Sequence, residues 1–299
     1  MIYDCVIVGG GAAGLCAATY LGRFRRRVLI VDANASRMRR IPLIRNLPGW
    51  PEGVRGEHLH ALLSRQAALY GARTCEDYVH AIAQHDDAFE LQGQQNYRAA
   101  TILLASGTQM AEPDMVGVSD AIAQGIVRYC PICDGYEAQG KEVAVLARRP
   151  SSLNEALFLR TYTEHVTYLC ETFGAQLSAC DQARATTQGI DYLARPIASI
   201  SMTEGGVRIS FDDGEHQDFD ILYPSLGCTP QSGLLSSLGG ALSAAGGVVT
   251  DPHQRTNVAG VYAAGDVLEG LDQIASAWGQ AALAATAIHN DLRKGTPHG

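Results

Sequence analysis

The sequence predicts an α/β protein in which a second domain is inserted into a first domain built from the two ends of the chain. Two observations indicate this. A glycine-rich turn lies between an apolar strand and a helix at the N-terminus, and another strand–helix–strand pattern begins near residue 142. Such units form parallel strand pairs. The 299 residues, 46% of them hydrophobic, are enough for two domains of ordinary size.

The N-terminal segments come in the order that a parallel unit requires. Residues 2–8 are short, apolar and rich in branched side chains, which is typical of a buried strand. We then expect a turn at 9–14, a helix at 15–24, a strand at 28–31, a polar loop at 36–56, a helix at 57–70 and a strand at 101–105.

The middle of the chain repeats the pattern and the end returns to it. We expect strands at 142–146 and 166–169 around a helix at 153–162, then short strands at 197–201, 206–211 and 218–223. The last elements are a strand at 260–264 and a long helix at 274–292. The expected domains are therefore 1–115 with 243–299, and an inserted domain at 116–242.

Charge and hydropathy exclude some classes of partner. The formal net charge of −8 argues against a nucleic-acid surface, which needs clustered positive charge. No apolar stretch reaches the length of a membrane span, and the N-terminus lacks the pattern of a secretion signal. We expect no nucleic acid and no membrane as partners, and a cytoplasmic location.

Residues 9–14 read G-G-G-A-A-G, which between a strand and a helix is a dinucleotide-binding fingerprint. Gly9 permits the tight turn, Gly11 lets the backbone approach a pyrophosphate at the helix N-terminus, and Gly14 allows close helix–strand packing. Asp32 closes the next strand, where a carboxylate accepts hydrogen bonds from ribose hydroxyls. An ordinary glycine turn is the alternative, and the context favours the dinucleotide.

The segment 256–266, T-N-V-A-G-V-Y-A-A-G-D, resembles the second FAD fingerprint of flavoproteins with two dinucleotide domains. This resemblance makes Gly265 and Asp266 flavin-site residues, with Asp266 accepting from the ribityl chain. Gln273 and Ile274 open the following helix, whose N-terminus carries free N–H groups and partial positive charge. Because two distant fingerprints are more specific than one, we expect FAD as the cofactor.

Cys130 and Cys133 form a C-x-x-C motif, which suits either zinc or a redox pair. A zinc site needs further Cys or His ligands at matching spacing, and none stands near it, so we expect no metal. A redox pair needs two thiols that can bridge, one of them with a lowered pKa. The adjacent Asp134 can relay protons if burial raises its pKa. We expect the other six cysteines, which are scattered, to be buried and inert.

The C-P-I-C-D-G segment after an FAD fingerprint resembles the low-molecular-weight thioredoxin reductases and their relatives. The stretches that match span nearly the whole chain: 9–14, 46–56, 105–107, 130–137 and 260–289. The resemblance implies a homodimer with a split, Rossmann-like FAD domain around an NAD(P)H-like domain. It also implies exchange of electrons between FAD and a small dithiol, a disulfide or a thioredoxin-like protein through a mixed disulfide.

The resemblance also assigns roles to residues. It implies that Cys133 faces the flavin and forms the charge-transfer pair, that Cys130 attacks or receives the substrate sulfur, and that Asp134 is the acid. Further cofactor contacts are expected in the glycine turn, the polar loop, the adenine region and the strand that ends near residue 105. These residues are Ala12, Ala13, Arg40, Ile41, Asn46, Val79, Ala105, Ser106 and Gly107.

The second fingerprint, with which this family binds NADPH, is degenerate. Residues 146–152 read L-A-R-R-P-S-S and contain no glycine, so the backbone cannot easily approach a pyrophosphate. After the next strand, Glu171 stands where the family carries a basic cluster for the 2′-phosphate, and it repels that group. We expect that NADPH is not used in the usual manner. Electrostatic binding of phosphate by Arg148 and Arg149 is the alternative.

In lacking the NADPH motifs, the chain resembles two branches of the family. One contains flavin-linked disulfide oxidoreductases without NADPH motifs, some of which take electrons from ferredoxin and some of which hold a second FAD. The other contains dithiol oxidases that use oxygen. The C-P-I-C-D-G-Y-E segment is closer to the first branch. An NADPH-dependent thioredoxin reductase with a diverged site, a dithiol oxidase and a non-catalytic flavoprotein stay open as alternatives.

Overall fold

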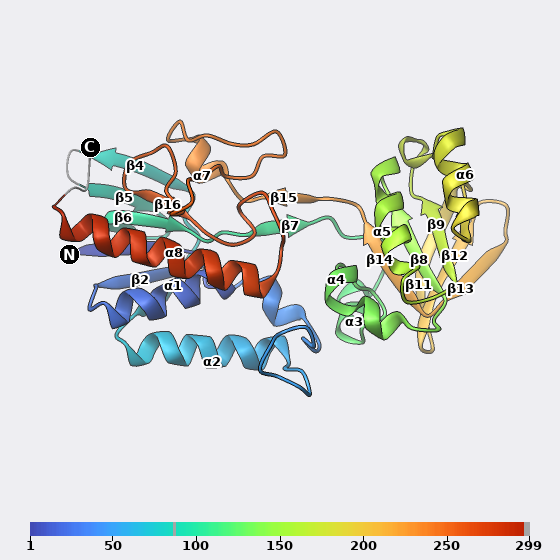
Figure 1. The fold of residues 1–299 in the computed structure, drawn as a ribbon, viewed down its shortest axis with the longest axis horizontal. Coiled ribbons are helices and arrows are strands. Elements are labelled where there is room, and N and C mark those ends of the chain that lie inside the picture. The colour runs from blue at the N-terminus through green and yellow to red at the C-terminus, as the bar shows by residue number, and fades with distance from the viewer. Residues whose placement is uncertain (86–87, 296–299) are drawn as a thin grey trace. The chain divides into compact units, whose positions relative to one another are not determined.

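The computed structural model describes residues 1–85 and 88–295, which form two compact units (Figure 1). Unit 1 comprises Met1–Arg39, Arg55–Gln109 and Thr229–Gly299, and unit 2 comprises Arg40–Val54 and Met110–Cys228. The sequence analysis had placed the boundaries at 115/116 and 242/243, and it had not separated the 40–54 loop from the first domain. The cofactor assigned to each domain stays a prediction.

Unit 1 is built on a seven-stranded sheet of order β3-β2-β1-β6-β5-β4, with β16 paired to the C-terminal part of β6. The strands are β1 (Ile2–Val8), β2 (Val28–Asp32), β3 (Arg73–Glu76), β4 (Ala81–His85), β5 (Ala88–Gln92), β6 (Asn96–Leu104) and β16 (Val261–Ala263). β1 runs parallel to both β2 and β6, so that Val8 pairs with Val31 and with Leu104. The carboxyl ends of these three strands therefore meet at one edge.

The two faces of this sheet bury different segments because successive strand residues point to opposite sides. Cys5 and Ile7 of β1 join a core with helices α1 (Ala12–Arg23) and α8 (Ile274–Arg293). Val6 and Val8 face a second core with the β4–β5 hairpin and residues from the 235–268 segment. The remaining helices of unit 1 are η1 (Arg37–Arg40), which ends beyond the boundary of the unit, α2 (Gly56–Leu69) and α7 (Gly233–Ser236).

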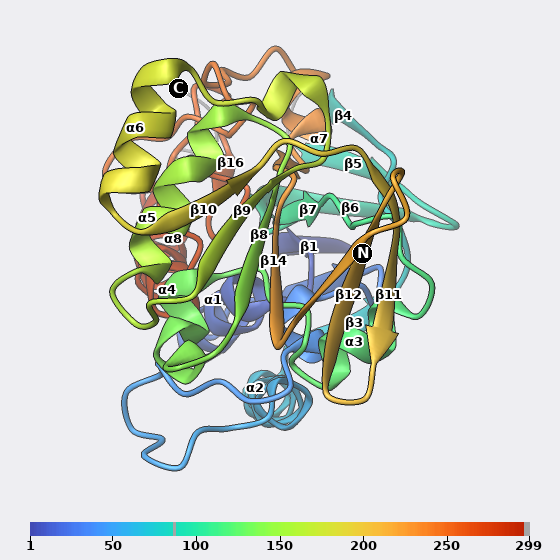
Figure 2. The same ribbon diagram turned by 90° about the vertical axis from the view of Figure 1, so that its right-hand side faces the viewer.

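Unit 2 holds a four-stranded parallel sheet of order β10-β9-β8-β14 and a three-stranded antiparallel sheet, β11-β12-β13 (Figure 2). The strands are β8 (Val143–Ala147), β9 (Val166–Cys170), β10 (Ile190–Leu193), β11 (Ile197–Thr203), β12 (Gly206–Phe211), β13 (His216–Phe219) and β14 (Ile221–Ser225). The helices are α3 (Val118–Ala123), α4 (Pro131–Asp134), η2 (Gly135–Ala138), η3 (Pro150–Ser152), α5 (Leu153–Leu159), η4 (Phe173–Ala175) and α6 (Ala179–Thr187).

Helices cover one face of the parallel sheet and the antiparallel sheet covers the other. Val143 and Val145 of β8 pack in a core with α5 and α6, whereas Ala144 and Leu146 pack with β11, β12 and β13. β8 and β14 are neighbours, and β9 lies on the other side of β8. The order therefore reverses between β8 and β14, which in open α/β sheets marks the edge where ligands bind.

Several predicted elements differ from the structure. The expected strand 218–223 is two strands, β13 and β14, because the chain leaves the antiparallel sheet at Asp220 and enters the parallel one. α1 begins at Ala12 rather than at residue 15. Short or weakly apolar elements were missed, among them β3, β4, β5, β10, α3, α4 and α6. β7 (Thr108–Met110) and β15 (Cys228–Pro230) were also missed, and they pair where the chain passes between the units.

None of the helices in residues 1–85 and 88–295 combines the length and the apolar character that a crossing of the bilayer requires. The longest helix is α8 with 20 residues, and polar and charged side chains interrupt it.

Gly14 gives a direct test of the packing at the edge of the unit 1 sheet. A Cβ at this position collides with the carbonyl oxygen of Gly9, which is backbone and cannot turn away. We expect Gly14→Ala to lower the free energy of unfolding by at least about 2 kcal/mol. The matched control is Gly279→Ala in α8, where nothing lies near the added Cβ, and it should stabilise by roughly 0.5–1 kcal/mol. Equal effects in urea unfolding would contradict the packing described here.

Candidate active site

The glycine turn of unit 1 is closely packed against backbone. Gly9 has φ +107° and donates its N–H to the carbonyl oxygen of Val31 at 2.9 Å. A side chain at Gly9 collides with the backbone of Ala105, and one at Gly14 collides with Gly9 itself. These contacts support the roles that the sequence assigned to Gly9 and Gly14. They also place Ala105, from the end of β6, beside the turn.

The N-terminus of α1 is open to an anion. Gly11 is the residue that precedes the helix, and no side chain caps its first N–H groups. No acidic residue stands in the first turn, which begins with Ala12 and Ala13. The nearest atom to a Cβ built on Gly11 is Ser36 Oγ at 3.5 Å, so space is present on that side. Free N–H groups at the end of a helix are the feature with which such turns bind phosphates.

Asp32 closes β2 and is tied to the same turn. Its Oδ1 accepts a hydrogen bond from the N–H of Gly10 at 3.0 Å. One carboxylate oxygen therefore positions the turn, and binding of ribose hydroxyls by Asp32 stays a prediction. His60 of α2 makes a 2.9 Å hydrogen bond to the carbonyl oxygen of Gly10. The sequence assigned no role to any histidine, because no short-range motif links α2 with the glycine turn.

The two fingerprints lie together although they are far apart in the sequence. Gly265, with φ +83°, lies so close to Ala13 that an added Cβ would be 2.9 Å from the Ala13 Cβ. The N–H of Gly265 donates to Gln280 Oε1 of α8 at 2.8 Å. Gln273 directly precedes α8 and Ile274 is its first residue, as the sequence predicted. The N-termini of α1 and α8 thus belong to one site in unit 1.

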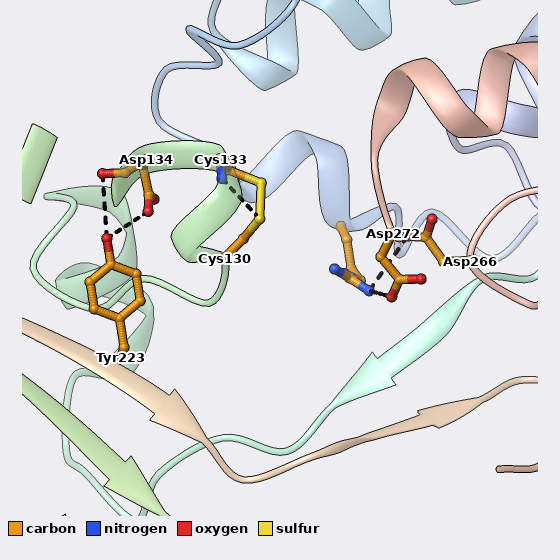
Figure 3. The surroundings of a disulfide bond; sticks show 7 residues. Cys130, Cys133, Asp134, Tyr223, Asp266 and Asp272 are labelled. Carbon is orange, nitrogen blue, oxygen red and sulfur yellow. Dashed lines mark hydrogen bonds and ion pairs between the residues drawn. A yellow bond between two sulfur atoms is a disulfide. The ribbon is translucent and has the colours of Figure 1, made fainter. Parts of the chain in front are cut away.

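Arg37 joins this site, and the sequence analysis missed it. Its Nη1 lies 3.5 Å from Asp266 Oδ2 and 3.7 Å from Asp272 Oδ2 (Figure 3). Burial raises the pKa of Asp266, and burial together with the Asp266 charge raises the pKa of Asp272 to about 6, while Arg37 lowers both. Arg37 Nη1 is buried and has no hydrogen-bond partner among the described residues.

These features fit FAD. Its pyrophosphate matches the uncapped end of α1, and its ribityl hydroxyls match the partly buried carboxyl of Asp266. The buried Nη1 of Arg37 needs an acceptor, and an oxygen-rich group such as the ribityl–phosphate chain supplies one.

The other predicted cofactor residues fall into two groups. Ser106 and Gly107 follow β6, where Ser106 Oγ donates to the carbonyl oxygen of Gln231 at 2.7 Å, and Val79 is buried in the core of unit 1. Arg40, Ile41 and Asn46 lie in the loop that groups with unit 2. Their contact with the cofactor stays a prediction.

Cys130 and Cys133 of unit 2 form a disulfide with a Cα–Cα distance of 5.2 Å (Figure 3). Cys130 precedes α4, and Pro131 occupies the first helical position, where its missing N–H costs nothing. The Cys130 Sγ accepts a hydrogen bond from the backbone N–H of Cys133 at 3.2 Å. Both cysteines are half-buried. A donor aimed at a sulfur favours its thiolate form after reduction.

Asp134 is the last residue of α4. The sequence analysis expected it to relay protons if burial raised its pKa, and the structure meets this condition. Burial raises the pKa of its carboxyl to about 6, against opposing hydrogen bonding from Tyr223 and attraction by Arg128. Tyr223 donates its hydroxyl to Asp134 Oδ1 at 2.8 Å, and Arg128 Nη1 donates to the Asp134 carbonyl oxygen at 3.0 Å. Tyr223 lies 89 residues away, so no spacing in the sequence indicates this contact.

The remaining cysteines correct one expectation. Cys5 and Cys170 are buried, and burial raises the pKa of Cys5 to about 12, which fits inert thiols. Cys16 and Cys75 are only half-buried, and Cys180 and Cys228 are exposed. The prediction was wrong for the two exposed cysteines because Cys180 lies on the outer side of a short surface helix and Cys228 on a two-stranded ribbon.

A bidentate ion pair spans the carboxyl edge of the parallel sheet in unit 2. Arg148, directly after β8, donates from Nε to Glu171 Oε2 at 2.6 Å and from Nη2 to Glu171 Oε1 at 2.8 Å. The hydrogen bonds to Glu171, directly after β9, raise the pKa of Arg148. Glu171 therefore neutralises Arg148, one of the two cations that were considered as substitute phosphate ligands, and the role of Arg149 stays a prediction.

The start of α5 at the same edge is filled with polar side chains. Ser225 Oγ, at the end of β14, donates to Glu155 Oε1 at 2.6 Å and lies 2.8 Å from Ser152 Oγ. Burial raises the pKa of Glu155. A carboxyl group and two hydroxyls thus lie where a glycine fingerprint presents bare backbone to a pyrophosphate.

Asp134→Asn tests the burial of the acid. Because the pKa of Asp134 is raised from 3.8 to about 6, the folded protein has its full stability below about pH 4 and loses it as the pH rises through about 6. Asn carries no charge and can still accept from Tyr223. We expect the variant to match the wild type near pH 4 and to be more stable by about 2 kcal/mol at pH 8 in urea unfolding. Asp114→Asn, at an exposed aspartate, is the control; identical pH dependence of the two variants would contradict the burial.

Comparisons with known proteins agree with this architecture. The pyridine nucleotide-disulphide oxidoreductase family matches residues 3–281. A thioredoxin reductase of Treponema pallidum is 29% identical over 299 residues, which cover 95% of each chain. A thioredoxin reductase structure from Streptococcus pyogenes has a TM-score of 0.90 at 25% identity, covering 98% of this chain and 99% of that one.

An atypical thioredoxin reductase, TRi from Desulfovibrio vulgaris Hildenborough, is 30% identical with a TM-score of 0.56 and covers 99% of this chain and 100% of that one. The predicted fold class, with Rossmann-like FAD and NAD(P) domains, is confirmed. The chain therefore belongs to the pyridine nucleotide-disulphide oxidoreductase family and, within it, is a flavoprotein of the low-molecular-weight thioredoxin reductase type.

Proposed function

We propose that this protein is an FAD-dependent thiol–disulfide oxidoreductase that exchanges electrons with its substrate through Cys130 and Cys133 and does not take them from NADPH. The observation that carries the proposal is the pair of disulfide and acid in unit 2. Two half-buried cysteines form a disulfide, and the next residue is a carboxyl whose pKa of about 6 suits proton transfer near neutral pH.

The chain supplies the groups for thiol–disulfide interchange. The Cys130 thiolate, favoured by the N–H of Cys133, attacks one sulfur of a substrate disulfide and expels the other as a thiolate. Protonated Asp134 gives that thiolate its proton. The Cys133 thiolate then attacks Cys130 Sγ, which reforms the disulfide and releases the second substrate thiolate, and this takes a proton from solvent. In sum the enzyme dithiol is oxidised and the substrate disulfide is reduced by two electrons.

The features of unit 1 support its role in the other half of the electron transfer. FAD, when bound, supplies or accepts the two electrons that open or close the Cys130–Cys133 bond. The uncapped N-terminus of α1 would hold its pyrophosphate, Asp32 the ribose and Asp266 the ribityl chain. Arg37 partly offsets the negative charge of Asp266 and Asp272.

The carboxyl edge of the unit 2 sheet supports independence from NADPH. Arg148 is engaged by Glu171, and Glu155 lies with two serines at the start of α5. The Arg148–Glu171 pair leaves little positive charge at this edge for the phosphates of NADPH, and the turn lacks the glycines that would admit them. A ferredoxin-type protein or a dithiol is the donor that we propose instead.

The relatives support a thioredoxin-like protein or a small disulfide as the substrate. The matched proteins from T. pallidum and S. pyogenes are thioredoxin reductases, and the C-P-I-C-D-G segment of this chain is intact. Within that segment, Ile132 between the cysteines is half exposed and offers an apolar contact beside the disulfide.

Single cysteine variants test the assignment of the two sulfurs. Cys133→Ser leaves Cys130, which should trap the substrate as a stable mixed disulfide, because the resolving thiolate is missing. Cys130→Ser should trap none. Turnover of a small disulfide such as 5,5′-dithiobis(2-nitrobenzoate) should fall at least about 100-fold in both variants. The matched controls are Cys180→Ser and Cys228→Ser, at exposed cysteines, which should leave turnover unchanged. Full turnover in Cys133→Ser would refute the catalytic assignment.

Anaerobic reduction of the purified holoprotein tests the electron donor. NADPH, NADH, dithiothreitol and reduced ferredoxin are compared by the loss of flavin absorbance in stopped-flow experiments. We expect fast bleaching with dithiothreitol or ferredoxin, and bleaching with NADPH slower by at least about 100-fold, because the phosphate site is missing. Fast bleaching by NADPH would favour the alternative of a reductase with a diverged cofactor site. The oxidase alternative predicts that oxygen reoxidises the dithiol-reduced flavin at the turnover rate.

A further inference from the structure

Tyr223 connects the parallel sheet of unit 2 to the acid beside the disulfide. It is the third residue of β14 and its side chain is completely buried. Its hydroxyl lies 2.8 Å from Asp134 Oδ1 and 3.4 Å from the Asp134 carbonyl oxygen (Figure 3). A phenol that is buried this completely needs a partner for its O–H, and Asp134 provides it. The strand thus determines where the carboxyl lies.

Arg128 fixes the backbone of the same residue. Its Nη1 donates to the Asp134 carbonyl oxygen at 3.0 Å, and its Nε donates to the Gly125 carbonyl oxygen at 2.8 Å. The backbone of Asp134 is therefore held by Arg128 and its side chain by Tyr223. Among the side chains that the structure describes, Tyr223 is the one that donates a hydrogen bond to this carboxyl, so it is the side chain that can orient the acid.

We propose that Tyr223 is a positioning residue for the reaction, which orients the Asp134 carboxyl and stabilises its ionised form through one hydrogen bond from the buried phenol. This rests on the proposed function, in which Asp134 transfers protons at the Cys130–Cys133 pair. Tyr223 itself neither gains nor loses a proton. It keeps donating its hydroxyl hydrogen to the carboxylate, and Asp134 carries the proton that neutralises the expelled substrate thiolate.

The groups around Asp134 act in opposite directions. Burial raises the pKa of the carboxyl most, and Glu137 of η2 raises it further. Tyr223 of β14 and Arg128, which precedes α4, lower it. Glu137 is itself partly offset by Arg45, whose Nε lies 3.5 Å from its Oε1. The ring of Tyr162, which follows α5, packs against Gly135, the residue directly after Asp134. With burial, Arg128 and Glu137 unchanged, loss of the phenol must raise the pKa of Asp134.

The test is Tyr223→Phe, which removes one hydroxyl and keeps the ring. Tyr168→Phe is the matched control, because Tyr168 is also completely buried, on β9 of the same sheet, and its hydroxyl donates to the carbonyl oxygens of Arg149 and Ala175 rather than to a carboxyl. The first readout is the titration of the Asp134 carboxyl carbon by NMR in the oxidised holoprotein. We expect the midpoint to move up by about one pH unit in Tyr223→Phe and to stay in place in Tyr168→Phe.

The second readout is the pH dependence of a single turnover of the reduced protein with bis(2-hydroxyethyl) disulfide, an alkyl disulfide whose expelled thiolate is basic enough to take the proton of Asp134. The rate should be roughly three- to tenfold lower at the optimum, because the acid is no longer held in place. The limb on which the rate falls with rising pH should shift upward with the midpoint. In an Asp134→Asn background, Tyr223→Phe should change neither the rate nor the profile.

The outcomes separate the two proposals. An unshifted midpoint in a folded Tyr223→Phe protein overturns the positioning role, even if the cysteine variants confirm the thiol chemistry. A shifted midpoint with an unchanged rate shows that Asp134 does not carry the proton, and it overturns the proposed mechanism instead. If Tyr223→Phe does not fold, the ¹³Cζ signal of Tyr223 in the wild type decides. It should titrate with the Asp134 carboxyl, and a flat signal contradicts the contact.

Discussion

The candidate cofactor site depends on three positions at the edge of the unit 1 sheet that have no room for a side chain. Gly9 lies against the backbone of Ala105, Gly14 against Gly9, and Gly265 against Ala13, so three segments of the chain approach one another more closely than a Cβ permits. This proximity brings the starts of α1 and α8 into one site. Two helix ends and two partly buried carboxyls then share a small region, where Arg37 offsets part of the negative charge.

Unit 2 also has a parallel sheet, but the edge at the carboxyl ends of its strands is occupied by side chains. It is the edge where a dinucleotide would bind. Arg148 pairs with Glu171 across the ends of β8 and β9, and Glu155 pairs with Ser225 at the start of α5. An ion pair with two parallel hydrogen bonds is held firmly and leaves little charge for a ligand. Unit 2 therefore has a parallel sheet of the dinucleotide-binding type, but side chains occupy the edge of that sheet.

Burial sets the chemistry of the redox segment. Asp134 is exposed enough to exchange protons and buried enough that its pKa rises to about 6, whereas an ordinary aspartate is ionised well below that pH. The raised pKa lowers the free energy of unfolding at neutral pH, because the ionised carboxylate then lies in a poorly solvated position. Tyr223 and Arg128 limit the cost by donating hydrogen bonds to the side chain and the backbone of the same residue. Such a trade of stability for function is common at active sites.

The sequence by itself determined the features that are local along the chain: the glycine turn, the Cys130–Cys133 pair, Asp134, the second fingerprint at Gly265 and the loss of glycines after β8. Each depends on backbone freedom or on the spacing of neighbouring residues, which a short segment encodes. Only the tertiary structure decided the pairs Tyr223–Asp134, Arg148–Glu171 and Arg37–Asp266, and the division of residues 218–223 between two sheets. These depend on strand order and register, because the two residues of each pair are far apart in the sequence and make contact only once the sheet has formed.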